Sequence, residues 1–242
     1  MRIIFSGRTD IGLKRKNNED AYLERLDLGF FTVADGMGGS AAGEIASRIF
    51  VETAREVFER GFYSDRETSA LVQEVFRLAN ERILLNTEEY PEHLGMGCTA
   101  ELIAFSGDRY IVGHVGDSRT YLFRDGELRR ITRDHSLVQE QLERGLITRE
   151  DAKKHRLRNV VLRAVGIESS VALDLIKGRM LPGDIFLLCS DGLTDMVDEE
   201  SIQETLASPH ELTDMVEQLI ESAKREGGND NITVVLCQVS PL

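Results

Sequence analysis

The sequence predicts an α+β fold built on antiparallel sheets. Strand patterns and helix patterns come in blocks along the chain rather than in strict alternation. Between residues 98 and 131, four short apolar runs follow one another with tight turns between them, which is the connectivity of an antiparallel meander. A chain of 242 residues can bury a large core without disulfides, so we expect a single domain over residues 1–242.

The first half of the chain begins with three strand-like runs, at residues 3–7, 21–26 and 30–34. The third run is almost continuously apolar, as expected for a strand that is buried on both faces. Helices are predicted over residues 41–60 and 68–87, because apolar residues recur there at three- and four-residue spacing, with Gly61 as a C-terminal cap. Both helices should pack on a sheet through one face.

The second half of the chain begins with the meander, whose strands are predicted at residues 98–105, 110–115, 119–123 and 127–131. Asp125 and Gly126 form its last turn. A polar, basic stretch over residues 136–163 then interrupts the strand pattern, and Thr148 and Asp151 are spaced as in a capping box. We interpret residues 132–166 as a flap. Strands resume at residues 171–180, 184–189 and 232–239, and Ser208-Pro209 predicts the start of a helix that runs to about residue 224.

Composition excludes several classes of protein. The formal charge of −13, from 42 acidic and 29 basic residues, disfavours a nucleic-acid footprint and attraction to anionic membranes. Cys98, Cys189 and Cys237 lie far apart in apolar runs, which predicts buried thiols in a reducing compartment. No signal peptide or membrane-spanning run stands out, so we expect a soluble cytoplasmic protein.

Five short aspartate motifs, each placed where an apolar run stops, carry the functional prediction. They are Asn-Glu-Asp at residues 18–20, Val-Ala-Asp-Gly-Met-Gly-Gly at 33–39, Gly-Asp-Ser-Arg at 116–119, Ser-Asp-Gly at 190–192 and Asp-Asn at 230–231. Any one of them alone is better explained as a turn, because Asp-Gly is a common hairpin sequence. Several carboxylates that converge in one cleft repel each other unless a cation lies among them. Five such motifs therefore predict a metal enzyme.

The order and spacing of these motifs resemble the metal-dependent serine/threonine protein phosphatases, the type-2C or PPM family, in its compact bacterial form. The resemblance runs from about Ser6 to Thr233 and includes the longer pattern Asp-x-Gly-x-x-Arg-x-x-Asn-Glu-Asp at residues 10–20. It implies a four-layer αββα sandwich, in which two packed antiparallel sheets are flanked by helix pairs and metals lie in a cleft at one end. It also implies hydrolysis of phosphoserine and phosphothreonine by direct attack of a water that bridges two Mn²⁺ or Mg²⁺ ions.

The same resemblance implies a role for each motif aspartate. Asp35 would bridge the two ions, the carbonyl of Gly36 would join the second ion, and Asp191 and Asp230 would hold the first. Asp20 would act through a metal-bound water. Ligation by oxygen atoms alone independently suits hard cations such as Mg²⁺ and Mn²⁺.

Other residues receive roles with an open alternative. Arg15 would grip the phosphate with its planar guanidinium, or it is a solvated member of the basic cluster at residues 14–16. Asp117 would hold a third, weaker metal together with Asp191, or it is a turn residue. Met37 stands where animal members carry a histidine proposed as general acid, so the proton donor is unassigned. His135 and His155 lie in the flap, where they could contact substrate.

Two rival functions are weighed against this hypothesis. A two-metal nuclease or other phosphodiesterase would use similar carboxylates but should carry a basic groove, which the acidic composition disfavours. A silent phosphoprotein-binding module on the same fold would lack metal ligands, and none is missing here. For the phosphatase hypothesis we expect phosphoproteins as substrates, a serine/threonine kinase and its targets as partners, and a monomer.

Overall fold

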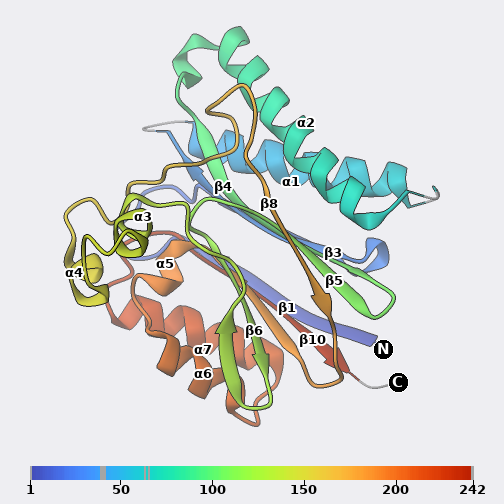
Figure 1. Cartoon of the computed structure of the whole chain (residues 1–242), viewed down its shortest axis with the longest axis vertical. Helices are drawn as coiled ribbons and strands as arrows, with labels where there is room; N and C mark the ends of the chain where they lie inside the picture. Colours follow the sequence, from blue (N-terminus) through green and yellow to red (C-terminus); the bar gives the residue numbers. More distant parts are fainter. Residues whose placement is uncertain (1, 39–41, 63, 65, 241–242) are drawn as a thin grey trace.

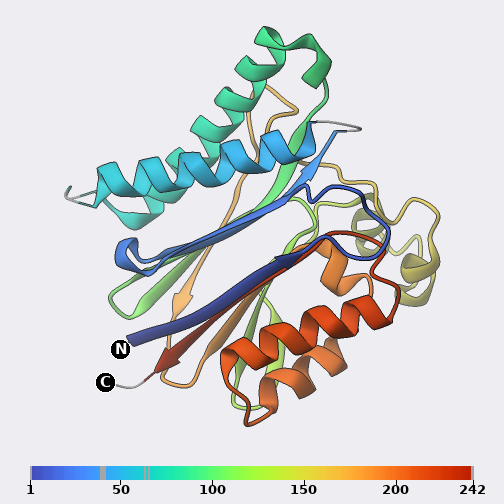
Figure 2. The same ribbon diagram turned by 180° about the vertical axis from the view of Figure 1, so that it is seen from behind.

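The computed structural model describes residues 2–38, 42–62, 64 and 66–240, and within them the chain forms two five-stranded antiparallel sheets packed face to face (Figure 1). Helices cover both outer faces, which Figure 2 shows from behind. This is the predicted α+β fold and the four-layer αββα sandwich. Gly39 of the glycine-rich motif and Ala41, the expected start of the first helix, lie outside the described residues.

One sheet has the strand order β2-β3-β4-β5-β8. Its strands are β2 (Asp20–Arg25), β3 (Phe30–Met37), β4 (Gly97–Ser106), β5 (Arg109–Val115) and β8 (Asp174–Arg179). Two long helices cover its outer face, α1 (Gly43–Gly61) and α2 (Thr68–Glu89). Their apolar stripes and the facing side chains of the sheet form one buried cluster, so the predicted one-face packing is confirmed.

The other sheet has the order β1-β10-β9-β6-β7. Its strands are β1 (Arg2–Asp10), β6 (Arg119–Arg124), β7 (Glu127–Arg130), β9 (Ile185–Cys189) and β10 (Ile232–Ser240). Its outer face is covered by α6 (Glu199–Ala207) and α7 (Leu212–Arg225), again through a cluster of buried apolar side chains. A third cluster fills the space between the two sheets. Strand β9 is buried along its whole length, as its continuous apolar sequence predicts.

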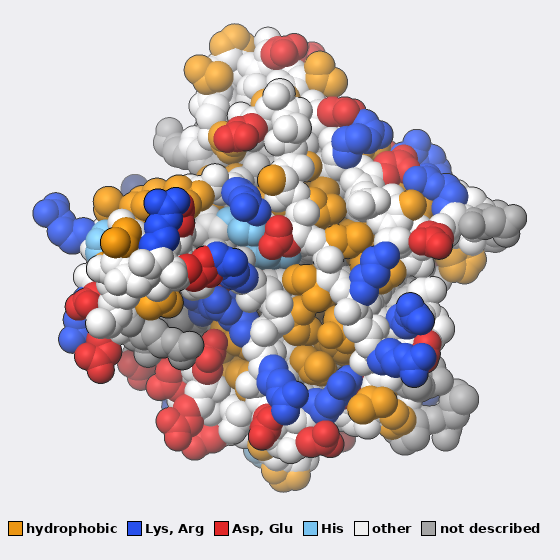
Figure 3. Space-filling model, in the orientation of Figure 1, with side chains coloured by type: hydrophobic (Ala, Val, Ile, Leu, Met, Phe, Trp, Pro, Cys, Tyr) orange, Lys and Arg blue, Asp and Glu red, His pale blue; other side chains and the backbone are white. Residues whose placement is uncertain are grey.

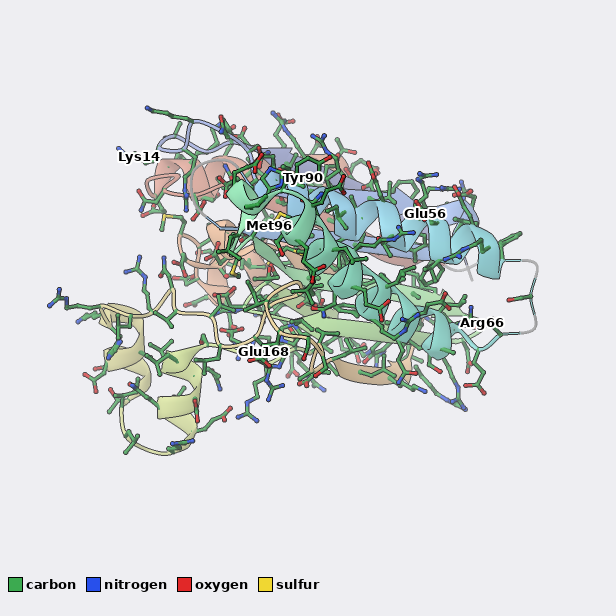
Figure 4. All side chains as sticks on the ribbon, turned by 90° about the horizontal axis from the view of Figure 1, so that it is seen from above. Lys14, Glu56, Arg66, Tyr90, Met96 and Glu168 are labelled. Atoms are coloured by element: carbon green, nitrogen blue, oxygen red, sulfur yellow. The ribbon has the colours of Figure 1, made fainter. Side chains whose placement is uncertain are left out.

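The remaining elements are short. They are α3 (Leu137–Glu143), α4 (Arg149–Lys154), α5 (Asp191–Thr194) and two 3₁₀ helices, η1 (Leu26–Leu28) and η2 (Pro91–His93). Helices α3 and α4 belong to the predicted flap, and they lie at the same end of the molecule as the loop that carries Lys14 (Figure 4). Thr148 and Asp151 form the predicted capping box, which explains where α4 begins.

Local patterns set most element boundaries correctly. Asp125 and Gly126 both have positive φ, 54° and 82°, as a tight hairpin turn requires. Gly61, however, is not the cap but the last residue of α1, and Phe62 is the C-cap. Glycine at position 61 serves packing, because a Cβ there would collide with Leu71 of α2. Strand β8 also begins three residues later than predicted, at Asp174.

The predicted helix start at Ser208-Pro209 is wrong. Ser208 instead ends α6, where its amide and hydroxyl both donate to the carbonyl of Thr205, and α7 begins at Leu212 after Glu211. Proline is as common just beyond a helix as at its first position, so the dipeptide alone does not distinguish an end from a start.

All three cysteines are buried and unpaired, as predicted. Among the described residues, no helix has the length and apolarity needed to cross a bilayer. On the face shown in Figure 3, Lys and Arg side chains are interspersed with Asp and Glu side chains rather than forming one continuous basic groove.

Candidate metal centre

A cavity of about 520 Å³ lies where the aspartate motifs meet. Its lining includes most of the residues that the sequence predicts for the site, namely Arg15, Asp35, Gly36, Asp117, Asp191 and Asp230. Glu19, Met37, Gly38, Thr99, Asn159 and Val161 complete the lining. The sequence thus predicted about half of the lining residues, and it assigned no site role to Glu19, Thr99 or the two flap residues, Asn159 and Val161.

Both sheets contribute carboxylates to this cavity. Asp35 lies near the end of β3, and its Cα is paired with that of Asp20 at the start of β2. Asp191 is the first residue of α5, two residues after the end of β9, and Asp230 lies two residues before the start of β10. Asp117 stands in the turn through which the chain leaves β5 of one sheet and enters β6 of the other. The strand ends therefore gather five carboxylates from segments that are far apart in sequence.

Two glycines allow the segments to approach closely. A Cβ on Gly36 would lie 2.1 Å from the carbonyl oxygen of Gly43, so no side chain fits between β3 and the start of α1. A Cβ on Gly192 would lie 1.9 Å from the carbonyl oxygen of Asn231. The Asp-Gly pairs at these positions are therefore required by packing and not by a turn.

Asp20 is buried and is not part of the cavity lining. Its Oδ2 accepts hydrogen bonds from Ser190 Oγ (2.8 Å) and Thr233 Oγ1 (2.5 Å). Both donors belong to the other sheet, since Ser190 follows β9 and Thr233 lies in β10. The side chain of Asn18 shapes this turn, because its Oδ1 accepts from the amide of Asp20 at 3.1 Å. Asp20 Oδ1 is buried and has no hydrogen-bond partner. One oxygen thus joins the two sheets and the other is left for a further partner.

Burial and mutual repulsion raise the pKa values of the carboxyls. Burial raises the pKa of Asp35 well above its usual value, and the charges of Asp20 and Asp191 add to the effect. Burial, followed by the charge of Asp117, does the same to the pKa of Asp191. Burial raises the pKa of Asp117 to about 7, and it raises the pKa of Asp20 to about 6 against the hydrogen bonds from Thr233 and Ser190. A group of carboxyls held in this state favours a bound cation or proton.

Arg15 stands at the rim of the cavity and pairs with Asp230. Its Nη2 lies 2.6 Å from Asp230 Oδ2, and half of its side-chain surface is exposed. The alternative that Arg15 is only a solvated residue of the basic cluster does not fit this contact. The guanidinium lies beside a cavity carboxylate, and the loop that carries Arg15 is held in place by contacts outside the cavity rim.

The anchor of that segment is Asn231, which the sequence motif contains but whose role it did not reveal. Asn231 is buried, and its Nδ2 donates to the carbonyls of Ile11 and Asn17, each at 3.0 Å. Its Oδ1 accepts from the amide of Glu19 at 2.8 Å. One amide side chain thereby fixes both ends of the loop that carries Arg15, across more than two hundred residues of sequence.

The flap histidines differ in position. His135 is buried at the base of the flap and contacts Gly116 rather than the cavity, whereas His155 is partly exposed beyond α4. Neither of them lines the cavity. Met37 does line the cavity, but its thioether cannot serve as the proton donor that a general acid requires.

The donor chemistry fits a hard divalent cation. As the side chains stand, no three acidic, histidine or cysteine side chains among the described residues converge closely enough to enclose an ion. Asp230 is turned to Arg15 and Asp20 Oδ2 to two hydroxyls. Asp20 Oδ1 and Asp191 Oδ1, in contrast, are buried without hydrogen-bond partners, and carboxylate and carbonyl oxygens are the ligands that Mg²⁺ and Mn²⁺ prefer. Metal coordination would satisfy these two atoms.

Comparisons with known proteins agree on one family. A family model described as protein phosphatase 2C matches residues 14–237. The chain is 41% identical over 236 residues to the serine/threonine protein phosphatase PstP of Mycobacterium tuberculosis (strain ATCC 25618 / H37Rv), an alignment that covers 97% of this chain and 45% of that protein. It is 37% identical over 236 residues to the serine/threonine phosphatase stp of Listeria monocytogenes serotype 4b (strain F2365), covering 96% and 94%. The chain thus spans about half the length of the mycobacterial relative and nearly all of the listerial one.

Solved structures give the same result. The crystal structure of the Mycobacterium tuberculosis serine/threonine phosphatase PstP/Ppp superimposes with a TM-score of 0.92 at 39% identity, covering all of both chains. The catalytic domain of PstP in complex with two manganese ions superimposes with a TM-score of 0.88 at 38% identity, covering 99% of each chain.

Proposed function

Because the chain belongs to the protein phosphatase 2C family, we propose that it is a metal-dependent serine/threonine protein phosphatase. The observation that carries the proposal is the cavity in which Asp35, Asp117, Asp191 and Asp230 meet, with a half-exposed arginine at its rim. The presence of two manganese ions in the PstP structure supports a centre of two Mn²⁺ or Mg²⁺ ions here. That residues 1–242 act as one catalytic domain stays a prediction.

We assign the metal ligands from the family resemblance, which the lining of the cavity supports. Asp35, Asp191, Asp230 and the carbonyl of Gly36 would hold the two ions. Asp20, which is buried outside the cavity lining, would act through a water held at the metal centre, and its unpartnered Oδ1 supports this role. When bound, the ions would supply Lewis acidity and lower the pKa of a water that attacks phosphorus at neutral pH.

The chain's own residues would bind and orient the substrate. Arg15 would take two phosphate oxygens with its guanidinium, in a fork geometry that an ammonium group cannot reproduce. Asn231 would hold the Arg15 loop in place through its hydrogen bonds to Ile11 and Asn17. Asp117 would serve a third, weaker ion with Asp191. Met37 cannot donate a proton, so the general acid stays unassigned.

Substrates and partners follow from the proposed activity. We propose phosphoserine and phosphothreonine proteins as substrates, and a serine/threonine kinase with its targets as the cellular partners. The names of the two relatives, both serine/threonine phosphatases, support phosphoserine and phosphothreonine as the substrate class. A monomeric state and a cytoplasmic location remain predictions from the sequence.

The test is phosphate release from a phosphothreonine peptide and from p-nitrophenyl phosphate, with Mn²⁺ and with chelator. We expect turnover only with metal. Asp35→Asn and Asp191→Asn should each lose nearly all activity while remaining folded, because a neutral amide binds Mn²⁺ poorly.

Asp125→Asn is the matched control, because Asp125 occupies an exposed hairpin turn in which asparagine is equally acceptable. It should keep wild-type turnover. Substantial Mn²⁺-dependent activity in Asp35→Asn or Asp191→Asn would overturn the site, and chelator-resistant hydrolysis by the wild type would overturn the proposed function.

A further inference from the structure

A buried acid–histidine pair lies under the base of the flap, outside the proposed metal centre. Glu101 of β4 and His114 of β5 are Cα partners in the sheet, and both side chains are fully buried. Glu101 Oε1 contacts His114 Nδ1, and Glu101 Oε2 accepts from Thr120 Oγ1 at 2.5 Å. Neither residue lines the cavity. Two ionisable groups in a sheet interior are costly unless every polar atom is satisfied.

The second ring nitrogen of His114 binds the flap. His114 Nε2 lies 2.7 Å from the carbonyl oxygen of Arg133. A carbonyl only accepts, so Nε2 carries a proton, and one further proton is shared between Nδ1 and the Glu101 carboxyl. Burial alone would lower the pKa of His114, but the charge and hydrogen bond of Glu101 raise it above its usual value. His114 therefore contacts Glu101 with one ring nitrogen and the backbone carbonyl of Arg133, where the flap begins, with the other.

The next flap residue in contact with this pair is His135. Its ring lies against that of His114, with centroids 4.5 Å apart. The amide of His135 donates to the carbonyl of Gly116 at 2.7 Å, and the amide of Gly116 donates back to His135 Nδ1 at 3.1 Å. Gly116 immediately precedes Asp117. The two rings, which are tilted by 36° to each other, thus connect Glu101 with the turn that carries one of the cavity carboxylates.

Residues 135–137 also hold the segment by which the flap returns, at residues 160–162. The carbonyl of His135 accepts from the amide of Leu162 at 2.7 Å, and the amide of Leu137 donates to the carbonyl of Val160 at 2.9 Å. Between these bonds lies Val161, which lines the cavity together with Asn159. Further along, Asn80 of α2 accepts from the amide of Gly166 (2.7 Å) and donates to the carbonyl of Glu168 (2.9 Å), where the chain rejoins the body beside α2 (Figure 4).

We propose that Glu101 and His114 form a positioning pair that fixes the base of the flap, and through it the Asp117 turn and the Asn159–Val161 wall, relative to the metal centre. The simpler alternative is that the pair only stabilises the sheet. The two differ because a positioning pair changes how the flap moves and how protein substrates are turned over, whereas a purely structural pair changes only overall stability. The part of the proposal that concerns turnover rests on the proposed phosphatase function.

The test compares Glu101→Leu with Glu101→Gln. Leucine removes both hydrogen bonds, whereas glutamine can accept from Thr120 with its oxygen and donate to His114 with its nitrogen. Amide hydrogen exchange of the wild type and both variants is measured at equal fraction folded. In Glu101→Leu, amides of residues 135–137 and 160–163 should exchange at least about tenfold faster, while the amide of Gly166 stays protected by its hydrogen bond to Asn80. Glu101→Gln should restore protection.

Kinetics and metal binding complete the test. For Glu101→Leu we expect kcat/KM for the phosphothreonine peptide to fall at least about tenfold, because small displacements of a cavity wall are costly in rate. Hydrolysis of p-nitrophenyl phosphate should fall less, and the Kd for Mn²⁺ measured by calorimetry should stay within about twofold. If Glu101→Leu does not fold, His114→Phe keeps the ring and removes both hydrogen bonds, with the same expected results.

Asp184→Asn is the matched control, since Asp184 is a buried carboxylate that pairs with Arg124 of β6, in the other sheet. It should reduce stability without altering flap exchange or substrate preference. Unchanged exchange at residues 135–137 and 160–163 in Glu101→Leu would overturn the positioning role. Equal losses for both substrates together with a loss of Mn²⁺ affinity would also overturn it, in favour of general support of the fold. The exchange measurement remains decisive even if the wild type proves to have no phosphatase activity.

Discussion

Arg15 and a divalent cation compete for the carboxylate of Asp230, so removing the Arg15 side chain should strengthen Mn²⁺ binding. The structure pairs Arg15 Nη2 with Asp230 Oδ2 at 2.6 Å, and we propose Asp230 as a metal ligand. Asp230 Oδ2 accepts from Arg15, and Asp230 Oδ1 accepts from the amide of Asn231 at 2.8 Å, so an ion bound by this carboxylate has to share its oxygens with these donors. Arg15→Ala abolishes the competing contact and also removes a positive charge from the rim of the centre, and both effects favour the metal.

The size of the effect follows from exposure. The side chain of Arg15 is 50% exposed and that of Asp230 is 28% exposed, so the ion pair is largely accessible to water. Pairs of this kind contribute about 0.5–1 kcal/mol, which corresponds to a roughly two- to fivefold lower Kd for Mn²⁺. The KM for a phosphothreonine peptide should move the other way and rise at least about tenfold, because the same guanidinium would grip the phosphate through charged hydrogen bonds.

The assay is calorimetric titration of Mn²⁺ into metal-free protein, followed by steady-state kinetics at saturating Mn²⁺. Arg8→Ala is the control: Arg8 pairs with Glu217 at 2.7 Å with similar exposure, 46% and 57%, but its partner lies on α7 away from the cavity. It should change neither Kd nor KM. The reasoning is refuted if Arg15→Ala binds Mn²⁺ with the same or lower affinity than wild type, because Asp230 would then not be shared between the two cations.

Two further predictions concern pH and the flap. In chelator, the melting temperature should rise as the pH falls from 8 to 6.5. The pKa of Asp117 is raised to about 7, so the folded state binds a proton there more tightly than the unfolded chain does. The folded protein therefore loses stability as the pH rises through that value. Asp117→Asn should raise the melting temperature at pH 8 and weaken this dependence, and a metal-free protein that is less stable at pH 6.5 than at pH 8 would contradict the assignment. Arg156 is exposed on the flap, so Arg156→Ala should change the ranking of phosphopeptides with acidic flanking residues while leaving p-nitrophenyl phosphate hydrolysis nearly intact. Arg158→Ala should change it less, because Arg158 Nε already lies 3.5 Å from Asp195 Oδ2; equal losses for both substrates would mean that the flap supports the centre itself.

The sequence predicted the strands and helices of the α+β fold because its strongest signals are local, whereas the four-layer sandwich was implied by the family resemblance. The continuous apolar runs of β3 and β9 and the Asp125-Gly126 turn depend on residues within a few positions of one another. The error at Ser208-Pro209 has the same origin, since a short polar dipeptide is compatible with both the end of one helix and the start of the next. What decides between them is the packing of Leu206 and Leu212 against the sheet, which is a tertiary property.

The candidate site was predictable to the extent that its residues stand at strand ends. Each motif aspartate could be located from the apolar run before or after it, but only the structure shows that Gly36 and Gly192 are points of close approach. The contacts between motifs could not be found this way: Arg15 meets Asp230, and Asn231 binds both ends of the Arg15 loop, across separations of more than two hundred residues. The flap wall at Asn159 and Val161 was missed because its sequence carries no periodic or chemical signal.

The position of the carboxylates links the proposed metal centre to the stability of the whole sandwich. Asp20 and Asp35 belong to one sheet, whereas Asp191 and Asp230 adjoin strands of the other. Without a cation, repulsion among them acts to separate the sheets at this end, and the hydrogen bonds from Ser190 and Thr233 to Asp20 oppose it. A cation shared by both sets would turn the repulsion into attraction across the interface between the sheets. We therefore expect Mn²⁺ to raise the melting temperature of the wild type, and to raise it much less in Asp35→Asn, as measured by calorimetry with metal in excess over Kd. An equal increase in both proteins would show that the stabilising ion binds elsewhere.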